Sequence, residues 1–116
     1  MKFSVENQDQ YSVITAEVEK LDSLSAPDLK SELLYIIKSG KDNIIVDLHK
    51  SRYCDSSGLS ALLTGNRLCK EAEGTFVVCG LQPAVEKLVS ISQLTSVFNI
   101  TKDKEEAADL LAANRV

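Results

Sequence analysis

The sequence predicts an α/β domain in which a mixed β-sheet of about four or five strands packs with about four α-helices. Three observations favour this class. Short apolar runs alternate along the chain with longer segments whose apolar residues recur at helical spacing. Two of the runs are nearly continuous, as in strands that are buried on both faces of a parallel sheet. Within residues 3–16, strand-forming residues alternate with other residues in two segments, which indicates an antiparallel hairpin.

The hairpin and a first helix occupy the N-terminal part of the chain. Residues 3–16 are rich in strand formers, and the polar stretch 6–10 divides them into two strands. A helix is expected from about Ser25 to Lys38. Ser25 can cap this helix in a box-like relation with Asp28, and Pro27 suits a first turn because its missing N–H costs nothing there.

Strands and helices then alternate to the end of the chain. We expect a strand at 44–48, a helix at about 57–73, a strand at 76–79, a helix at 83–91, a short strand at 97–100 and a helix from about 103. The second helix has an apolar stripe of Leu59, Leu62, Leu63, Asn66 and Cys69. Such alternation indicates parallel strands that are joined by right-handed crossovers.

Composition limits the class of protein. A chain of 116 residues suits one domain, so we expect residues 1–116 to fold as a unit. Acidic residues outnumber basic ones by 17 to 13 without a basic stripe, which argues against a nucleic-acid binder. The three cysteines lack a CxxC spacing and suit reduced thiols. No apolar run approaches the ~20 residues of a membrane span. We therefore expect a cytoplasmic protein.

The segment Tyr53 to Ser60 carries the strongest chemical signal. It lies between a buried strand and an amphipathic helix, where partner and ligand sites of parallel α/β sheets gather. Either Asp55 or Ser56 can cap the helix, and Gly58 permits a close approach to its first turn. A phosphate on Ser56 would add about −1.5 to −2 charge at the positive end of the helix dipole. On local chemistry alone, a simple structural cap is the better explanation of the same four residues D-S-S-G.

The wider pattern resembles the STAS domains of bacterial anti-sigma factor antagonists. The resemblance covers nearly the whole chain. It rests on the run 44–48 followed by D-S-S-G at Asp55 to Gly58, on the Leu21-Asp22 pair with Ala26 four residues later, and on the stretch 76–85. The family often has a glycine where this chain has Glu19, and the loop His49 to Arg52 is unusually basic.

This resemblance implies a phosphorylation-switched binding module and no enzymatic activity. Ser56 matches the serine that an anti-sigma factor with serine kinase activity phosphorylates, and a serine phosphatase reverses the reaction. The dephosphorylated form binds the kinase and releases the sigma factor. Asp22 matches an acidic position near the phosphorylation site, Asp55 is the motif aspartate, and Ser57 and Gly58 support the helix start. A monomer is expected.

Several other functions compete with that of a phosphorylation switch. A STAS domain can also serve as an unphosphorylated subunit of a lipid-transport or stressosome-like complex. A hydrolase could use Ser56 with His49 and either Asp47 or Asp22, but the G-x-S-x-G elbow is absent. His49 is the sole histidine, no zinc-type ligand spacing is present, and no phosphate-cradling loop occurs. We therefore expect no metal and no cofactor.

Overall fold

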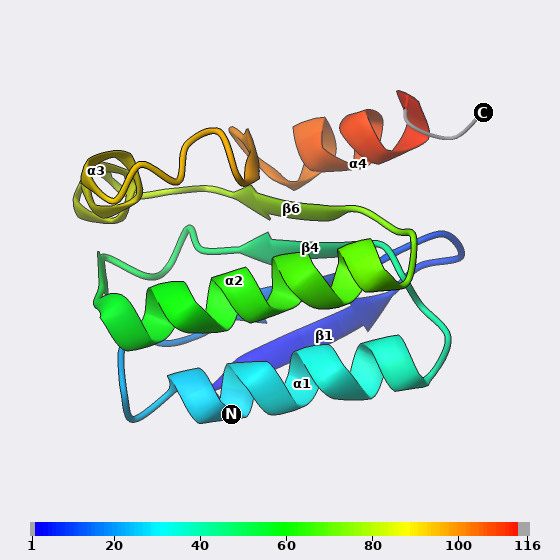
Figure 1. Ribbon diagram of the computed structural model, residues 1–116, viewed down its shortest axis with the longest axis horizontal. Coiled ribbons are helices and arrows are strands. Elements are labelled where there is room, and N and C mark those ends of the chain that lie inside the picture. Colours follow the sequence, from blue (N-terminus) through cyan, green and yellow to red (C-terminus); the bar gives the residue numbers. More distant parts are fainter. Residues whose placement is uncertain (1, 114–116) are drawn as a thin grey trace.

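A five-stranded mixed sheet forms the centre of the protein in the computed structural model, which describes residues 2–113 (Figure 1). Its strands, in spatial order, are β1 (Phe3–Asn7), β2 (Ser12–Ala16), β4 (Ile44–Asp47), β6 (Phe76–Cys79) and β7 (Asn99–Thr101). β1 and β2 are antiparallel, and the other neighbours are parallel. The predicted hairpin, the mixed sheet and the α/β class are confirmed.

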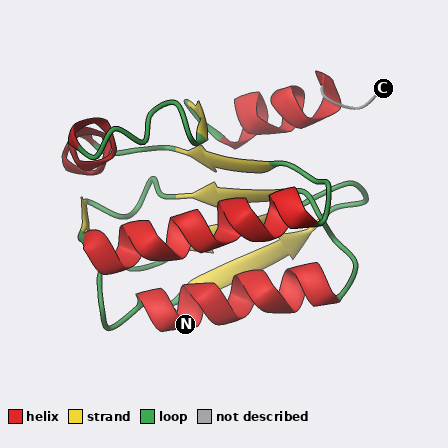
Figure 2. Cartoon of the chain, viewed as in Figure 1, coloured by secondary structure: helices red, strands yellow, loops and turns green. Residues whose placement is uncertain are grey.

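The described chain has four helices, and the first three provide the crossovers between parallel strands. The four are α1 (Ala26–Lys38), α2 (Ser56–Glu71), α3 (Pro83–Ile91) and α4 (Lys104–Ala113). Each of the first three lies between two parallel strands in the chain, as the sequence predicted. α1 and α2 run side by side over one face of the sheet, and α4 covers part of the other (Figures 1 and 2).

The central strands β4 and β6 are buried at every position, which explains their continuous apolar runs. Ile44 and Val46 belong to the core under α1 and α2. The intervening Ile45 joins a smaller core under α4. Side chains of one strand therefore supply two separate apolar layers, because successive residues point to opposite faces of the sheet.

The predicted stripe of α2 is wrong at two positions. Leu63 is 37% exposed and Asn66 is only half-buried, whereas Ala61 and Gly65 are buried. A β-carbon on Gly65 would lie 2.5 Å from the ring of Phe76 and 3.1 Å from a methyl of Leu33. α2 thus packs through small residues because it lies close to both the sheet and α1, and apolar size alone does not reveal this face.

Smaller differences concern two other elements. The last strand starts two residues later than predicted, because Phe98 packs into the core before pairing with β6 begins. Ser25 does precede α1, but its hydroxyl makes no cap hydrogen bond. The hydroxyl instead donates to the Lys20 carbonyl and accepts from the Asp22 amide, both at 3.1 Å, and so closes the turn before the helix.

Within residues 2–113, none of the helices combines the length and the apolar character that crossing a bilayer requires.

Replacing Leu33 by alanine should lower the free energy of unfolding by ~2–5 kcal/mol, because this side chain of α1 is completely buried in the main core. The matched control is Leu34→Ala at the next position of α1, where the leucine is 42% exposed and its loss should cost under about 1 kcal/mol. Urea denaturation followed by circular dichroism measures both. Equal losses would contradict the assigned buried face of α1.

Candidate functional site

The start of α2 is capped by Asp55. This residue has extended backbone angles, and its Oδ1 accepts hydrogen bonds from the amides of Ser57 at 2.9 Å and Gly58 at 3.1 Å. The sequence left open whether Asp55 or Ser56 is the cap, and the structure decides for Asp55. Ser56 is the first helical residue and is exposed. Its hydroxyl is consequently not needed to satisfy the helix.

A short second sheet positions this helix start. β3 (Lys20–Leu21) pairs in parallel with β5 (Tyr53–Cys54), and the Asp55 amide donates to the Leu21 carbonyl at 3.2 Å. The sequence prediction missed both strands, because two-residue strands carry no periodicity. Because β5 leads directly into α2 and lies beside β3, Ser56 is placed next to the loop before α1.

Gly58 is required by the same contact. A β-carbon at this position would collide with the carbonyl oxygen of Leu21 and would lie 2.8 Å from the sulfur of Cys54. No rotation of a flexible side chain relieves a clash with a backbone oxygen. The glycine therefore lets the first turn of α2 rest directly on β3, as the sequence suggested for this position.

Ser56 and Ser57 lie in one shallow depression of about 280 Å³, between the start of α2 and the start of α1. Its other lining residues are Ser23, Ala26, Pro27, Lys30 and Ser60. Lys30 was not foreseen from the sequence, since a lone lysine on an amphipathic helix carries no signal. Lys30 adds a positively charged side chain to the lining of the depression.

Asp22 lies in the loop between β3 and α1, which borders this depression. It follows β3 directly, and its Oδ1 accepts from the Leu24 amide at 3.0 Å, which shapes the loop before α1. The neighbouring Ser23, and not Asp22, lines the depression. Asp22 thus holds the loop that forms one wall of the depression, whereas Asp55 organises the other wall.

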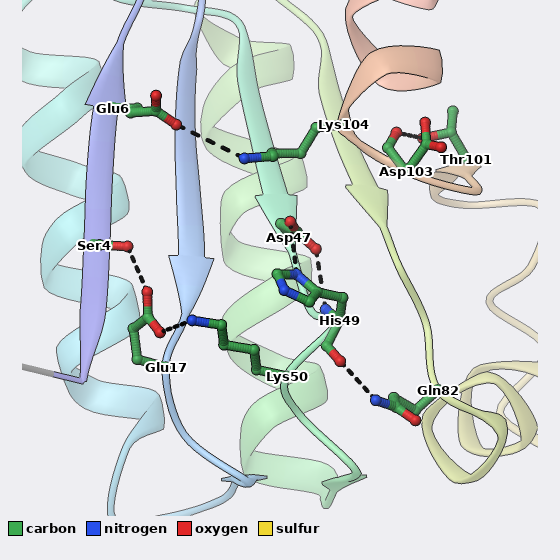
Figure 3. A network of polar contacts seen from close by, with 10 residues as sticks. All are labelled: Ser4, Glu6, Glu17, Asp47, His49, Lys50, Gln82, Thr101, Asp103 and Lys104. Atoms are coloured by element: carbon green, nitrogen blue, oxygen red, sulfur yellow. Dashed lines mark hydrogen bonds and ion pairs between the residues drawn. The ribbon is translucent and has the colours of Figure 1, made fainter.

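Asp47 and His49 form a separate polar group on the face of the sheet that carries α4 (Figure 3). Asp47 is almost fully buried, and its Oδ2 lies 2.9 Å from His49 Nδ1. The His49 carbonyl accepts from Gln82 at 2.6 Å. This pair lines a depression with Gly80, whereas Ser56 lines the one described above. The structure thus brings together Asp47 and His49, the acid and base of the hydrolase triad considered above, but places the nucleophile Ser56 in a different depression.

The surroundings of the three thiols disfavour the thiolate form. Burial raises the pKa of Cys54, Cys69 and Cys79 to about 12, and the Asp55 carboxylate adds to the effect at Cys54. Cys69 and Cys79 are in the core, as predicted, and Cys54 is partly exposed. Across residues 2–113, no cluster of three histidine, cysteine or carboxylate side chains is arranged to hold a metal ion.

Comparison with known proteins identifies the family. The model of the family described as the STAS domain matches residues 2–107. The chain belongs to the STAS domain family. BtrV of Bordetella bronchiseptica, which carries the provisional name anti-sigma factor antagonist, is 30% identical over 88 residues, or 76% of each chain.

Solved STAS structures share the fold. An anti-sigma factor antagonist domain protein of Planctomyces limnophilus superposes with a TM-score of 0.86 at 21% identity, over 95% of this chain and 97% of that one. The antagonist SpoIIAA in its unphosphorylated form gives 0.81 at 22% identity, over 96% of both chains. Its phosphorylated form, from Bacillus, gives 0.72 at 23% identity over 93% and 97%. At these identities the likeness shows that the STAS fold is shared.

Removing the cap should destabilise the STAS domain. Asp55→Ala should lower the free energy of unfolding by about 1 kcal/mol, because two first-turn amides lose their acceptor. Asp55→Asn is the matched control and should stay near the parent, since asparagine caps as well as aspartate. Urea unfolding measures both variants. A loss of the same size in Asp55→Asn would show that the carboxylate charge, and not the cap, stabilises the site.

Gly58→Ala should destabilise the protein, although a glycine-to-alanine change inside a helix ordinarily stabilises it by roughly 0.5–1 kcal/mol. The sign reverses because the added methyl meets the Leu21 carbonyl. Ser60→Ala, at an exposed position of the same helix, is the control and should be neutral or slightly stabilising. Thermal unfolding distinguishes the two. A stabilised Gly58→Ala would disprove the close approach between α2 and β3.

Proposed function

We propose that this STAS protein is an anti-sigma factor antagonist, a binding module without enzymatic activity that phosphorylation of Ser56 switches off. In the dephosphorylated form it binds an anti-sigma factor that is also a serine kinase, and the sigma factor is released. A serine phosphatase restores the binding form. The observation that carries the proposal is the exposed Ser56 at the first position of α2, relieved of any capping duty by Asp55.

A kinase substrate needs a hydroxyl that can be reached and modified without unfolding the domain. Ser56 meets both conditions, because its backbone is held by the cap while its side chain faces an open depression. A phosphate there would lie near the amides of the first turn and near Lys30, which favour negative charge. The Asp55 carboxylate opposes it. The fold can therefore accept the phosphate, and its main effect falls on a docked partner.

The surface around Ser56 suits a protein partner. Leu24, in the loop before α1, is 79% exposed, and Tyr53 and Leu63 are also exposed large apolar side chains. Leu63 lies two turns after Ser56 on the same side of α2, and Tyr53 lies three residues before it in β5. A partner that buries these side chains would also cover Ser56. A dianionic phosphate would then have to be desolvated, which opposes binding.

The named relatives point the same way. BtrV has a name that assigns it to the anti-sigma factor antagonists, and SpoIIAA has been solved both with and without phosphate. We extend this role to the present chain, and we propose that it acts as a single-domain cytoplasmic monomer.

Ser56→Ala should bind the cognate anti-sigma kinase whether or not ATP is present, because the variant has no acceptor for phosphate. Ser56→Asp should bind at least about tenfold more weakly, equivalent to ~1.4 kcal/mol, since a fixed negative charge would lie within the interface. The kinase is first isolated from native cells by its retention on the Ser56→Ala protein, and titration calorimetry then measures both affinities.

Ser57→Ala is the matched control, since it removes the neighbouring hydroxyl of the same depression, and ATP should still release the kinase from it. Intact-mass spectrometry of the protein from native cells should show one phosphate, located at Ser56. Equal kinase affinity of Ser56→Ala and Ser56→Asp would refute the switch. Absence of phosphate under all growth conditions, with phosphatases inhibited, would favour a passive subunit of a larger complex.

A further inference from the structure

A groove runs along the free edge of the sheet. β7 is the last strand and has a neighbour on one side only. α3 packs with the core on one face of the sheet and α4 with the core on the other, and residues of both helices line the groove beside β7. The groove between them has a volume of about 890 Å³, and Val89, Ile100 and Leu110 contribute to its apolar floor.

The border of the groove is acidic. Glu86 on α3 and Glu106 and Asp109 on α4 all line it, and all three are exposed. Among the ion pairs of the described residues, none involves these carboxylates. Lys102 borders the adjoining depression together with Glu86 and Glu106, so it offsets part of this charge. The groove as a whole keeps an excess of negative charge beside its apolar floor.

An edge strand presents backbone N–H and C=O groups that another extended chain can pair with. Strand addition of this kind takes its affinity from main-chain hydrogen bonds and its specificity from pockets for alternate side chains. Here α3 and α4 both line the groove beside β7 with carboxylates, so that basic side chains of an added strand would meet them. Apolar side chains of the same segment would rest on the groove floor.

We propose that this groove binds an extended segment of a partner protein that combines basic and apolar side chains, and that the segment joins the sheet as a strand beside β7. The charge of the groove selects this occupant. A second copy of the chain would bring the same carboxylates of two molecules together, and nucleic acid or an anionic lipid surface would be repelled in the same way.

This groove is distinct from the proposed switch. None of its lining residues lines the depression of Ser56. The proposal therefore concerns a second docking surface, which remains available in both phosphorylation states. Failure of either proposal leaves the other unaffected, because a variant at Ser56 should not change binding at the groove.

The test uses a blocked synthetic heptapeptide of alternating lysine and valine, titrated into the ¹⁵N-labelled full chain. The amide signals of β7, α3 and α4 should shift in a saturable way. The same peptide with glutamate in place of lysine should cause no shifts. A peptide with N-methylated backbone amides should bind at least about tenfold more weakly, because it lacks the donors that strand pairing needs. Ser56→Ala should bind the lysine peptide like the parent.

A charge variant examines the border of the groove. The triple substitution Glu86→Gln, Glu106→Gln and Asp109→Asn should weaken peptide binding about tenfold, as expected for three exposed ion pairs of modest strength. The control is Glu19→Gln, Glu73→Gln and Glu105→Gln, which changes the net charge equally at exposed sites outside the groove and should bind like the parent.

Several results would overturn the proposal. These are no saturable binding of the lysine peptide, shifts centred on the start of α2, equal affinity of the N-methylated peptide, or equal weakening by the two triple variants. Self-association of the free protein through β7, detected by sedimentation and by shifts that depend on concentration, would assign the edge to a second copy instead.

Discussion

The contact between Gly58 and the Leu21 carbonyl sets the position of the functional surface. Because no β-carbon stands between them, the first turn of α2 rests on β3, and β5 is held in register beside it. That contact brings the end of one crossover next to the beginning of another. The depression that contains Ser56 and Lys30 exists only because these two chain segments meet. A larger residue at 58 would displace the helix start and separate the walls of the site.

The adjacent residues Asp55 and Ser56 have different roles. Asp55 satisfies the amides at the helix start, so the hydroxyl of Ser56 has no capping role and is exposed to solvent. A residue that both capped the helix and accepted phosphate would couple modification to helix stability. Separating the duties lets the charge of the surface change while the fold is preserved, which a reversible binding switch requires. The proposed docking groove beside β7 follows the same principle, since its exposed carboxylates would select a partner without contributing to the core.

Periodicity in the sequence was sufficient for the class of fold and for most elements. The continuous runs at β4 and β6 and the hairpin of β1 and β2 have patterns that follow directly from burial on two faces or one. The prediction failed where an element is too short to show a period, or where close packing decides which face of a helix is buried. β3 and β5 are too short to show a period, and the inner face of α2 uses Ala61 and Gly65 where larger apolar residues were expected. Ser25 likewise closes a turn where it had been expected to cap a helix.

The sequence by itself determined the α/β class, the order of the main elements and the helix start at Asp55 to Gly58. These properties depend on residue type and on spacing along one chain, so they can be predicted from the sequence. Only the tertiary structure decided that Asp55 is the cap, that Lys30 lines the depression of Ser56, that His49 and Ser56 occupy separate depressions, and that carboxylates border the edge of β7. Each of these features depends either on contacts between residues that are distant in sequence or on which of two adjacent residues takes a role. Both are decided by packing in three dimensions.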